Sequence, residues 1–235
     1  MEEHRSADEL AAALDEIRQS PATTGTVELI VRRPAENERE VVEEAELDLD
    51  LGLVGDMWKA RGSSRTPDRS ANPDAQLTLM NARAAQAIAG SKERRPLAGD
   101  QLFVDLDLSI ENLPAGTRLT VGDAVIEVTP EPHTGCAKFT ARFGIEATRW
   151  INSHKDLRLR GICAIVAEPG TEPDLIEPGD VVVRQGLPDT EREPALVGQA
   201  LPEPQRPEPA VLVVHGGHST RRGDPETIPH RVHEL

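Results

Sequence analysis

The chain has 235 residues, 37% of them hydrophobic and 2% aromatic, and a formal net charge of −15 at pH 7. This length allows one sizeable domain with extensions, and because tyrosine is absent its core must come from Leu, Val, Ile and Ala. The negative charge argues against binding to nucleic acid or to an anionic membrane, since both attract basic proteins.

The N-terminal sequence M-E-E-H-R-S-A-D lacks the apolar stretch of a signal peptide, and no apolar run approaches the roughly 18 residues that span a bilayer. The two cysteines, Cys136 and Cys163, do not suggest a disulfide scaffold. We therefore expect a cytoplasmic protein that does not enter a membrane.

The chain divides into three parts by composition and pattern. Residues 1–23 form a helical extension, in which Ser6 and Glu9 make a capping-box pattern ahead of apolar residues at helical spacing. Residues 24–187 hold most of the apolar alternation and form the main domain. Residues 188–235 contain eight prolines and scattered charges, which predicts a disordered tail.

Apolar and polar residues alternate with a period of two in many short segments of the main domain, which predicts half-buried strands. The segments at 27–32 and 47–51 are expected to pair as antiparallel neighbours, and Gly122-Asp123 predicts a tight hairpin between 118–121 and 124–129. Further strands are expected at 76–80, 102–108, 161–167 and 181–183, and short helices at 82–89 and 143–153. Many strands without β-α-β alternation predict a mostly β fold, a closed or nearly closed β-barrel with short decorating helices.

The segment at residues 130–144, P-E-P-H-T-G-C-A-K-F-T-A-R-F-G, is the strongest candidate for chemistry. It sets Cys136 between a Pro/Gly turn and the basic residues Lys138 and Arg142. Nearby cations favour the thiolate, the form that attacks electrophiles or ligates a soft metal. Cys163 lies in an apolar run instead, which indicates a packed core cysteine.

Residues 138–160 are basic in this acidic chain. Six cations stand against Glu146 and Asp156, and such a cluster is either a solvated face or a cradle for a phosphate. The six are Lys138, Arg142, Arg149, Lys155, Arg158 and Arg160.

Several motifs in this order resemble a MOSC domain, the C-terminal domain of molybdenum-cofactor sulfurases. They are G-T-V-E-L-I-V-R-R-P at 25–34, L-G-L-V-G-D-M-W at 51–58, Q-L-T-L-M-N at 76–81, A-G-D at 98–100, E-N-L at 111–113, L-T-V-G-D at 119–123, the cysteine turn, R-G at 160–161 and P-G-D at 178–180. The resemblance implies a mixed barrel that handles the molybdenum cofactor, or a sulfur atom destined for it, at one cysteine.

Carried onto this chain, the resemblance gives Cys136 the role of metal ligand or persulfide carrier. It makes Lys138, Arg142 and Arg160 candidates for the phosphate of the cofactor. Asn112 either hydrogen-bonds the pterin or holds the cysteine loop. His133 occupies a position where many relatives have arginine, so its contact with an anion is weakened or pH-dependent, unless it is a loop residue bonded to backbone.

Three functions remain open from the sequence. The first is a molybdenum-dependent oxidoreductase that reduces N-hydroxylated small molecules with electrons from a partner electron-transfer protein. The second is a sulfurtransferase-like carrier, in which Cys136 receives a persulfide from a separate cysteine desulfurase that holds the pyridoxal phosphate. The third is a binding module without turnover, and a Cys–His hydrolase built on Cys136 and His133 is a weaker alternative because their spacing does not ensure the geometry.

Overall fold

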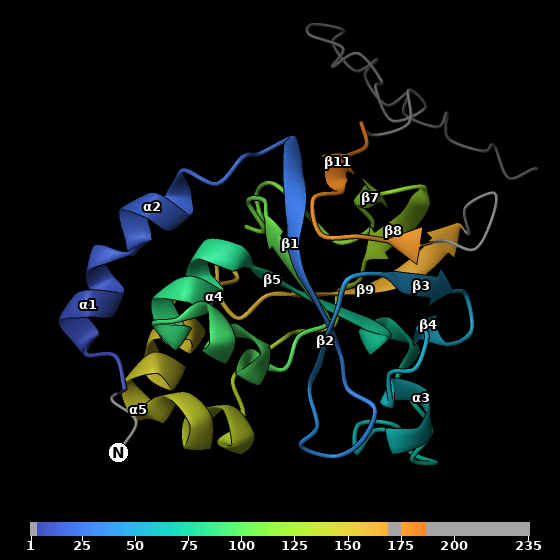
Figure 1. The fold of residues 1–235 in the computed structure, drawn as a ribbon, viewed down its shortest axis with the longest axis horizontal. Helices are drawn as coiled ribbons and strands as arrows, with labels where there is room; N and C mark the ends of the chain where they lie inside the picture. The colour runs from blue at the N-terminus through green and yellow to red at the C-terminus, as the bar shows by residue number, and fades with distance from the viewer. Residues whose placement is uncertain (1–3, 169–174, 187–235) are drawn as a thin grey trace, which may run out of the picture. The chain divides into compact units, whose positions relative to one another are not determined.

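The computed structural model describes residues 4–168 and 175–186. Its centre is a closed mixed β-barrel of seven strands in the order β11-β7-β8-β9-β5-β6-β1, which closes because β1 also pairs with β11 (Figure 1). Only β5 and β6 run parallel among these neighbours. The predicted barrel is confirmed. Its strands are β1 Thr24–Arg32, β5 Leu77–Asn81, β6 Leu102–Asp105, β7 Arg118–Val121, β8 Ala124–Val128, β9 Ile162–Glu168 and β11 Val181–Arg184.

The predicted pairing of the first two strands is wrong. The outer end of β1 pairs with β2, a short strand absent from the prediction, and β3 joins a separate sheet with β4 and β10. The chain turns after Asp48, because the Oδ1 of Asp48 accepts hydrogen bonds from the backbone N–H groups of Asp50 (2.8 Å) and Leu51 (2.7 Å). These strands are β2 Glu40–Val42, β3 Ala45–Asp48, β4 Gly52–Leu53 and β10 Leu175–Ile176.

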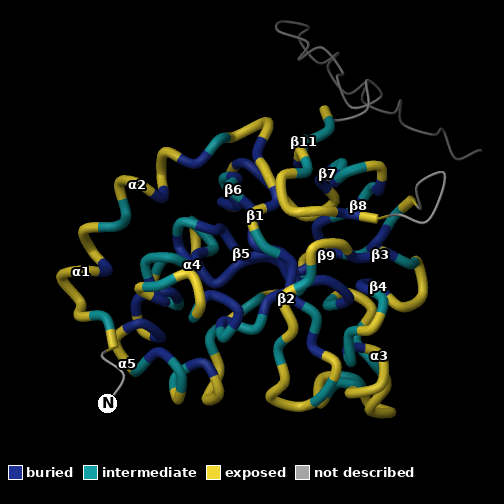
Figure 2. The backbone as a smooth tube through the Cα atoms, viewed as in Figure 1, coloured by how far each residue is buried: buried dark blue, intermediate teal, exposed yellow. Residues whose placement is uncertain are grey.

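Two apolar clusters stabilise the fold. Figure 2 shows the buried stretches of the backbone in dark blue. One cluster fills the barrel with Leu, Ile, Val and Ala side chains from alternating strand positions, as the period of two requires. The other lies between the barrel and the helices, and it uses the chain's three phenylalanines, Phe103, Phe139 and Phe143. The helices are α1 Ala7–Ala12, α2 Leu14–Arg18, α3 Trp58–Arg61, α4 Ala82–Ala89 and α5 Ala137–Ser153, with 3-10 segments at Pro73–Ala75 and Lys92–Ala98.

The N-terminal extension is bound to the main body by its apolar face. Ser6 and Glu9 form the predicted capping box, and the segment divides at Ala13 into α1 and α2. Leu10 and Ile17 are buried in the cluster between barrel and helices. The predicted tail, residues 188–235, lies outside the described residues.

Helix α5 begins at Ala137, six residues before the predicted start at residue 143. The spacing of the buried residues Phe139, Phe143 and Ala147 is helical, but the basic residues between them obscured the pattern. Gly144, at φ +85°, interrupts the helix and redirects its axis. Lys138 and Arg142 are therefore helical residues on the turns that follow Cys136.

The strand predicted at 102–108 ends at Asp105. Beyond it, the Asp107 carboxylate accepts hydrogen bonds from the N–H of Ser109 (2.9 Å) and from its hydroxyl (3.1 Å), which turns the chain. Within the described ranges, no helix has the length and apolar character needed to cross a bilayer.

Candidate functional site

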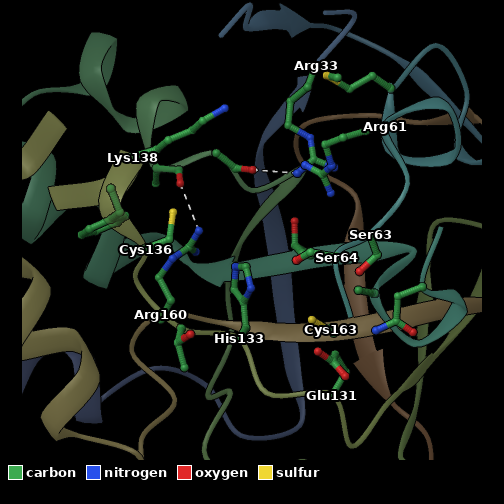
Figure 3. A pocket seen from close by; sticks show the side chains of 18 of the residues that line it. Arg33, Arg61, Ser63, Ser64, Glu131, His133, Cys136, Lys138, Arg160 and Cys163 are labelled. Carbon is green, nitrogen blue, oxygen red and sulfur yellow. Dashed lines mark hydrogen bonds between the residues drawn. The ribbon is translucent and has the colours of Figure 1, made fainter. Parts of the chain in front are cut away.

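A cleft of about 480 Å³ lies beside the Cys136 turn, where segments from distant parts of the sequence meet. Figure 3 shows Cys136, Lys138 and Arg160 along one side and Ser63 and Ser64 along the other. Seven cations and two glutamates line it, a marked local excess of positive charge in a chain of net charge −15. The cations are Arg33, Arg39, Arg61, Arg65, Lys138, Arg142 and Arg160.

Cys136 is exposed and stands immediately before α5. The loop that leaves β8 is held to the second half of this helix, because the N–H of Gly135 donates to Oδ1 of Asn152 (2.9 Å). The carbonyl of Cys136 accepts the first helical hydrogen bond, from the N–H of Thr140 (3.0 Å). The backbone of Cys136 is thus fixed while its thiol stays accessible at the cleft.

Two buried arginines, Arg33 and Arg160, form the base of the cleft, and we call them the floor arginines. Arg33 binds both oxygens of the buried Asp56 (2.7 and 2.8 Å) and donates to the Gly99 carbonyl (3.0 Å). Arg160 donates to Asp100 Oδ2 at 2.5 Å. Each floor arginine is thus neutralised by a buried carboxylate, as burial of a guanidinium requires.

Three further arginines, Arg39, Arg61 and Arg142, are half-buried or exposed in the cleft, and we call them the rim arginines. Within the described residues, none of them forms an ion pair with a carboxylate. Arg142 donates to the carbonyl of Leu97 (2.9 Å), and Arg39 donates to that of Glu38. The rim therefore carries positive charge that no carboxylate of residues 4–168 or 175–186 contacts directly.

The pKa values of two rim arginines reflect this crowding. Burial, together with the charges of Arg142 and Arg33, lowers the pKa of Arg39 to about 10. Burial and the charge of Arg33 also lower the pKa of Arg61. An anion in the cleft would relieve both effects, because it would compensate the cations that repel one another.

The predicted basic segment does not form a single surface. Lys138 lines the cleft, but it is exposed and bonded to Glu36 (2.6 Å). Arg149 pairs with Glu146 on the exposed face of α5. Of the six cations, Lys138, Arg142 and Arg160 line this cleft, while Lys155 and Arg158 line a second one.

His133 belongs to the cleft, but its partner is a side chain and not the backbone contact considered from the sequence. Its Nε2 lies 2.8 Å from Oδ1 of Asp100, whose other oxygen binds Arg160. Burial and the charge of Arg160 lower the pKa of His133 despite the opposing effect of Asp100. Burial by itself would raise the pKa of Asp100, but Arg160 and His133 hold it at about 2.

Asn112 does not line the cleft. Its side-chain amide donates to the carbonyls of Ala22 and Asp107 (both 2.8 Å), so it ties its own loop to the segment ahead of β1. Cys163 is buried in β9, although it borders the cleft from below. Burial and the Asp100 carboxylate raise the pKa of its thiol to about 12, which suppresses thiolate chemistry there.

Several residues of the site were not predicted from the sequence. Arg33 and Asp100 stand in the quoted motifs R-R-P and A-G-D but were not assigned a role. Arg61 and Arg65 stand in a polar stretch of the sequence at 60–75 that is rich in Ser, Arg and Pro, and its length could have indicated function because long loops are often functional. Nothing in the sequence indicated that Arg39 is a site residue, because it stands in an acidic stretch. Only the tertiary structure brings it to the cleft.

A second cleft of about 490 Å³ is lined in part by residues 129–135 of the loop that leads to Cys136. The two clefts share part of that loop, including His133, together with Arg160 and Cys163. Residues of the loop therefore separate two solvent-accessible spaces. Among the described residues, no three or more His, Cys, Asp or Glu side chains gather in an arrangement that could hold a metal ion.

Comparison with known proteins gives similarity of fold. No protein-family model and no curated protein matches the chain. The crystal structure of a hypothetical protein is similar over 72% of this chain and 70% of its own, with 20% identity and a TM-score of 0.50. YuaD from Bacillus subtilis (17% identity, 68% of this chain and 94% of that one, TM-score 0.47) and YiiM from Escherichia coli (21%, 69% and 70%, 0.45) are also similar.

Proposed function

We propose that the chain is a MOSC-type protein that binds the molybdenum cofactor in the first cleft, beside Cys136. One observation carries the proposal: an exposed thiol borders a cleft lined by seven cations and two glutamates in an otherwise acidic chain. The similar barrel folds agree with this proposal, and the motifs around Cys136 suggest the family.

The residues of the cleft fit the parts of this cofactor. Its phosphate requires cations, which the rim arginines provide, and no carboxylate in the described part of the chain competes by direct contact. The Nε atoms of Arg39 and Arg160 are buried, and neither has a hydrogen-bond partner among the described residues. Its thiophilic metal suits a thiolate, and Cys136 offers an accessible thiol.

Bound there, the cofactor would supply a redox centre that reduces N-hydroxylated small molecules with electrons from an external donor protein. The chain's own residues have simpler tasks. The rim arginines and Lys138 would bind and orient the anion, and the Cys136 thiolate would ligate the metal. Phe139 and Met57, which also line the cleft, would give it apolar surface.

The accessibility of Cys136 also supports a second candidate. An exposed thiol can be reached by the persulfide of a partner desulfurase, so the chain could carry sulfur for maturation of a metal-sulfur cofactor. A binding module without turnover would use the same residues. These alternatives differ in what Cys136 holds after purification.

The test is the molybdenum and pterin content of the full chain after anaerobic purification from a cofactor-producing host. We expect near-stoichiometric molybdenum in the wild type and in Cys163→Ser, which serves as the matched control for loss of a thiol. We expect its loss in Cys136→Ser and in a host that cannot make the cofactor. A persulfide on Cys136 without molybdenum would favour the carrier instead. The absence of both molybdenum and a persulfide would refute both functions.

Turnover separates the reductase from the binding module. The loaded wild type should reduce a hydroxylaminopurine to the aminopurine with reduced methyl viologen as the electron donor. A chain that retains molybdenum but gives no product with several N-hydroxylated substrates would contradict the reductase.

A further inference from the structure

A buried carboxylate connects two nitrogen-bearing side chains at the base of the cleft. Asp100 is fully buried, and its two oxygens bind different partners: Oδ2 accepts from Arg160 (2.5 Å), while Oδ1 lies 2.8 Å from Nε2 of His133. Arg160 is held in turn by the carbonyl of Ala98 (3.1 Å), and its guanidinium lies over the ring of Phe139 (5.2 Å). The carboxylate is therefore fixed, and it fixes the orientation of the imidazole.

This arrangement determines which ring nitrogen of His133 carries the proton. The ionised carboxylate of Asp100 can only accept a hydrogen bond, so Nε2 must be the donor. In the neutral ring, Nδ1 then keeps a free lone pair. No described residue hydrogen-bonds Nδ1, and the side chain is 17% exposed. His133 thus presents one proton-accepting nitrogen that is open to solvent.

The surroundings make the protonated ring a ready proton donor. Arg160 and Arg33 repel the imidazolium, burial disfavours it, and Asp100 alone among the principal influences stabilises it. The neighbouring Glu131 is bonded to Arg65. The net effect is a lowered pKa for His133, so the imidazolium form gives up its Nδ1 proton easily.

We propose that His133 is a catalytic acid of this cleft, with Asp100 as its positioning residue. The proposal rests on the proposed reduction of N-hydroxylated compounds. In that reaction R–NHOH, two electrons and two protons give R–NH₂ and water. The N–O bond breaks, an external electron-transfer protein supplies both electrons, and the oxygen leaves as water.

The Nδ1–H of protonated His133 supplies one proton, to the departing oxygen, and solvent supplies the other, to nitrogen. His133 lines both clefts, so solvent in the second cleft can return its proton. The rate should therefore fall as the pH rises through the pKa of His133, because only the protonated ring can donate.

Two variants and one control test this inference. His133→Gln can still donate a hydrogen bond to Asp100 but cannot act as an acid, so the fold and the molybdenum content should persist. We expect its kcat to fall about 10²-fold or more, with loss of the dependence on pH below 7. Asp100→Asn should weaken the same step and shift the pH profile. His154→Gln, a change on the second cleft only, should leave both rate and profile unchanged.

Nuclear magnetic resonance of the cofactor-free chain gives a readout independent of turnover. Two-bond ¹⁵N–¹H spectra at pH 8 should show His133 as the Nε2–H tautomer, and titration should place its pKa below 6.5. An Nδ1–H tautomer would overturn the inference, as would an unchanged kcat and pH profile in a fully loaded His133→Gln protein. In either case the proposed function would stand. A wild type without molybdenum would instead overturn the proposed function, and the inference with it.

Discussion

The floor arginines and the rim arginines line one cleft but stand in opposite electrostatic situations. Arg33 and Arg160 are buried, and each binds a fully buried carboxylate. Arg39, Arg61 and Arg142 are more exposed and contact no carboxylate among the described residues. Arginine thus serves two purposes in this cleft. The floor arginines maintain the shape of the cleft, and the rim arginines offer the charge that a ligand can neutralise.

The largest effect should come from removing a carboxylate of the floor. Asp100→Asn would leave the guanidinium of Arg160 buried without a counter-charge, at a cost of about 3–5 kcal/mol in the free energy of unfolding. Urea denaturation measures this cost. Glu36→Gln is the matched control, because Glu36 pairs with Lys138 at the surface, where solvent screens the ion pair and its loss should change stability little. Equal losses in the two variants would contradict the role of the buried carboxylate in neutralising a floor arginine.

Changes at the rim should affect ligand binding and leave stability intact. Arg39→Gln combined with Arg142→Gln should unfold at the same urea concentration as the wild type in chloride, or higher, because repulsion is reduced. The wild type should gain stability from inorganic phosphate at constant ionic strength, by about 2.7 kcal/mol at a hundredfold excess over Kd. The double variant should lose that gain, whereas Arg149→Gln, outside the cleft, should keep it. An equal gain in all three proteins would show that phosphate binds elsewhere.

The two cysteines provide a second comparison between a buried group and an accessible one. Cys163→Ser places a hydroxyl in the buried core of β9 and should cost about 1–3 kcal/mol if the hydroxyl finds no partner. Cys136→Ser is an exposed change and should alter stability by no more than about 0.5 kcal/mol. Thermal unfolding of both variants measures the difference. The assignment fails if Cys136→Ser is the more destabilised protein.

The smallest effect should be a change of stability with pH. The pKa of His133 lies below its ordinary 6.5 in the fold, so the unfolded chain binds more protons than the folded one near that pH. The protein therefore loses stability through this group as the pH falls below about 6.5. The pKa of Asp100 lies near 2 against an ordinary 3.8, so its contribution is lost only between those values. Thermal unfolding from pH 8 to 5 should therefore show a decline in the wild type that is reduced in His133→Gln. An identical slope in the two proteins would refute the role of His133 in this range.

The barrel could be predicted because its signals are local. A period of two identifies strands, and a Gly-Asp pair identifies the hairpin between β7 and β8 without knowledge of the rest of the chain. Pairing between distant strands was not predictable in the same way. The partner of β1 was misassigned because the turn at residues 49–51, after Asp48, has the same alternation as a strand.

For the site, the sequence identified Cys136 and the basic residues close to it, since they are neighbours in one segment. It missed Arg39 and Arg61, which reach the cleft from a strand connection and a helix end far from residue 136. It also grouped residues 138–160 as one basic cluster, although α5 carries only Lys138, Arg142 and Arg149, and the other three cations follow its last residue, Ser153. Side-chain direction along a helix, not linear proximity, determines which charges act together.

The sequence by itself thus determined the class of fold, the accessible cysteine and the buried one, because alternation and turn residues act over a few positions. Only the tertiary structure decided which arginines are neutralised. Asp100 and Arg160 are 60 residues apart, and Arg33 and Asp56 are 23 apart, so no spacing rule connects them. Whether a charge is available to a ligand depends on its burial and on the carboxylate beside it, and both exist only once the barrel has closed.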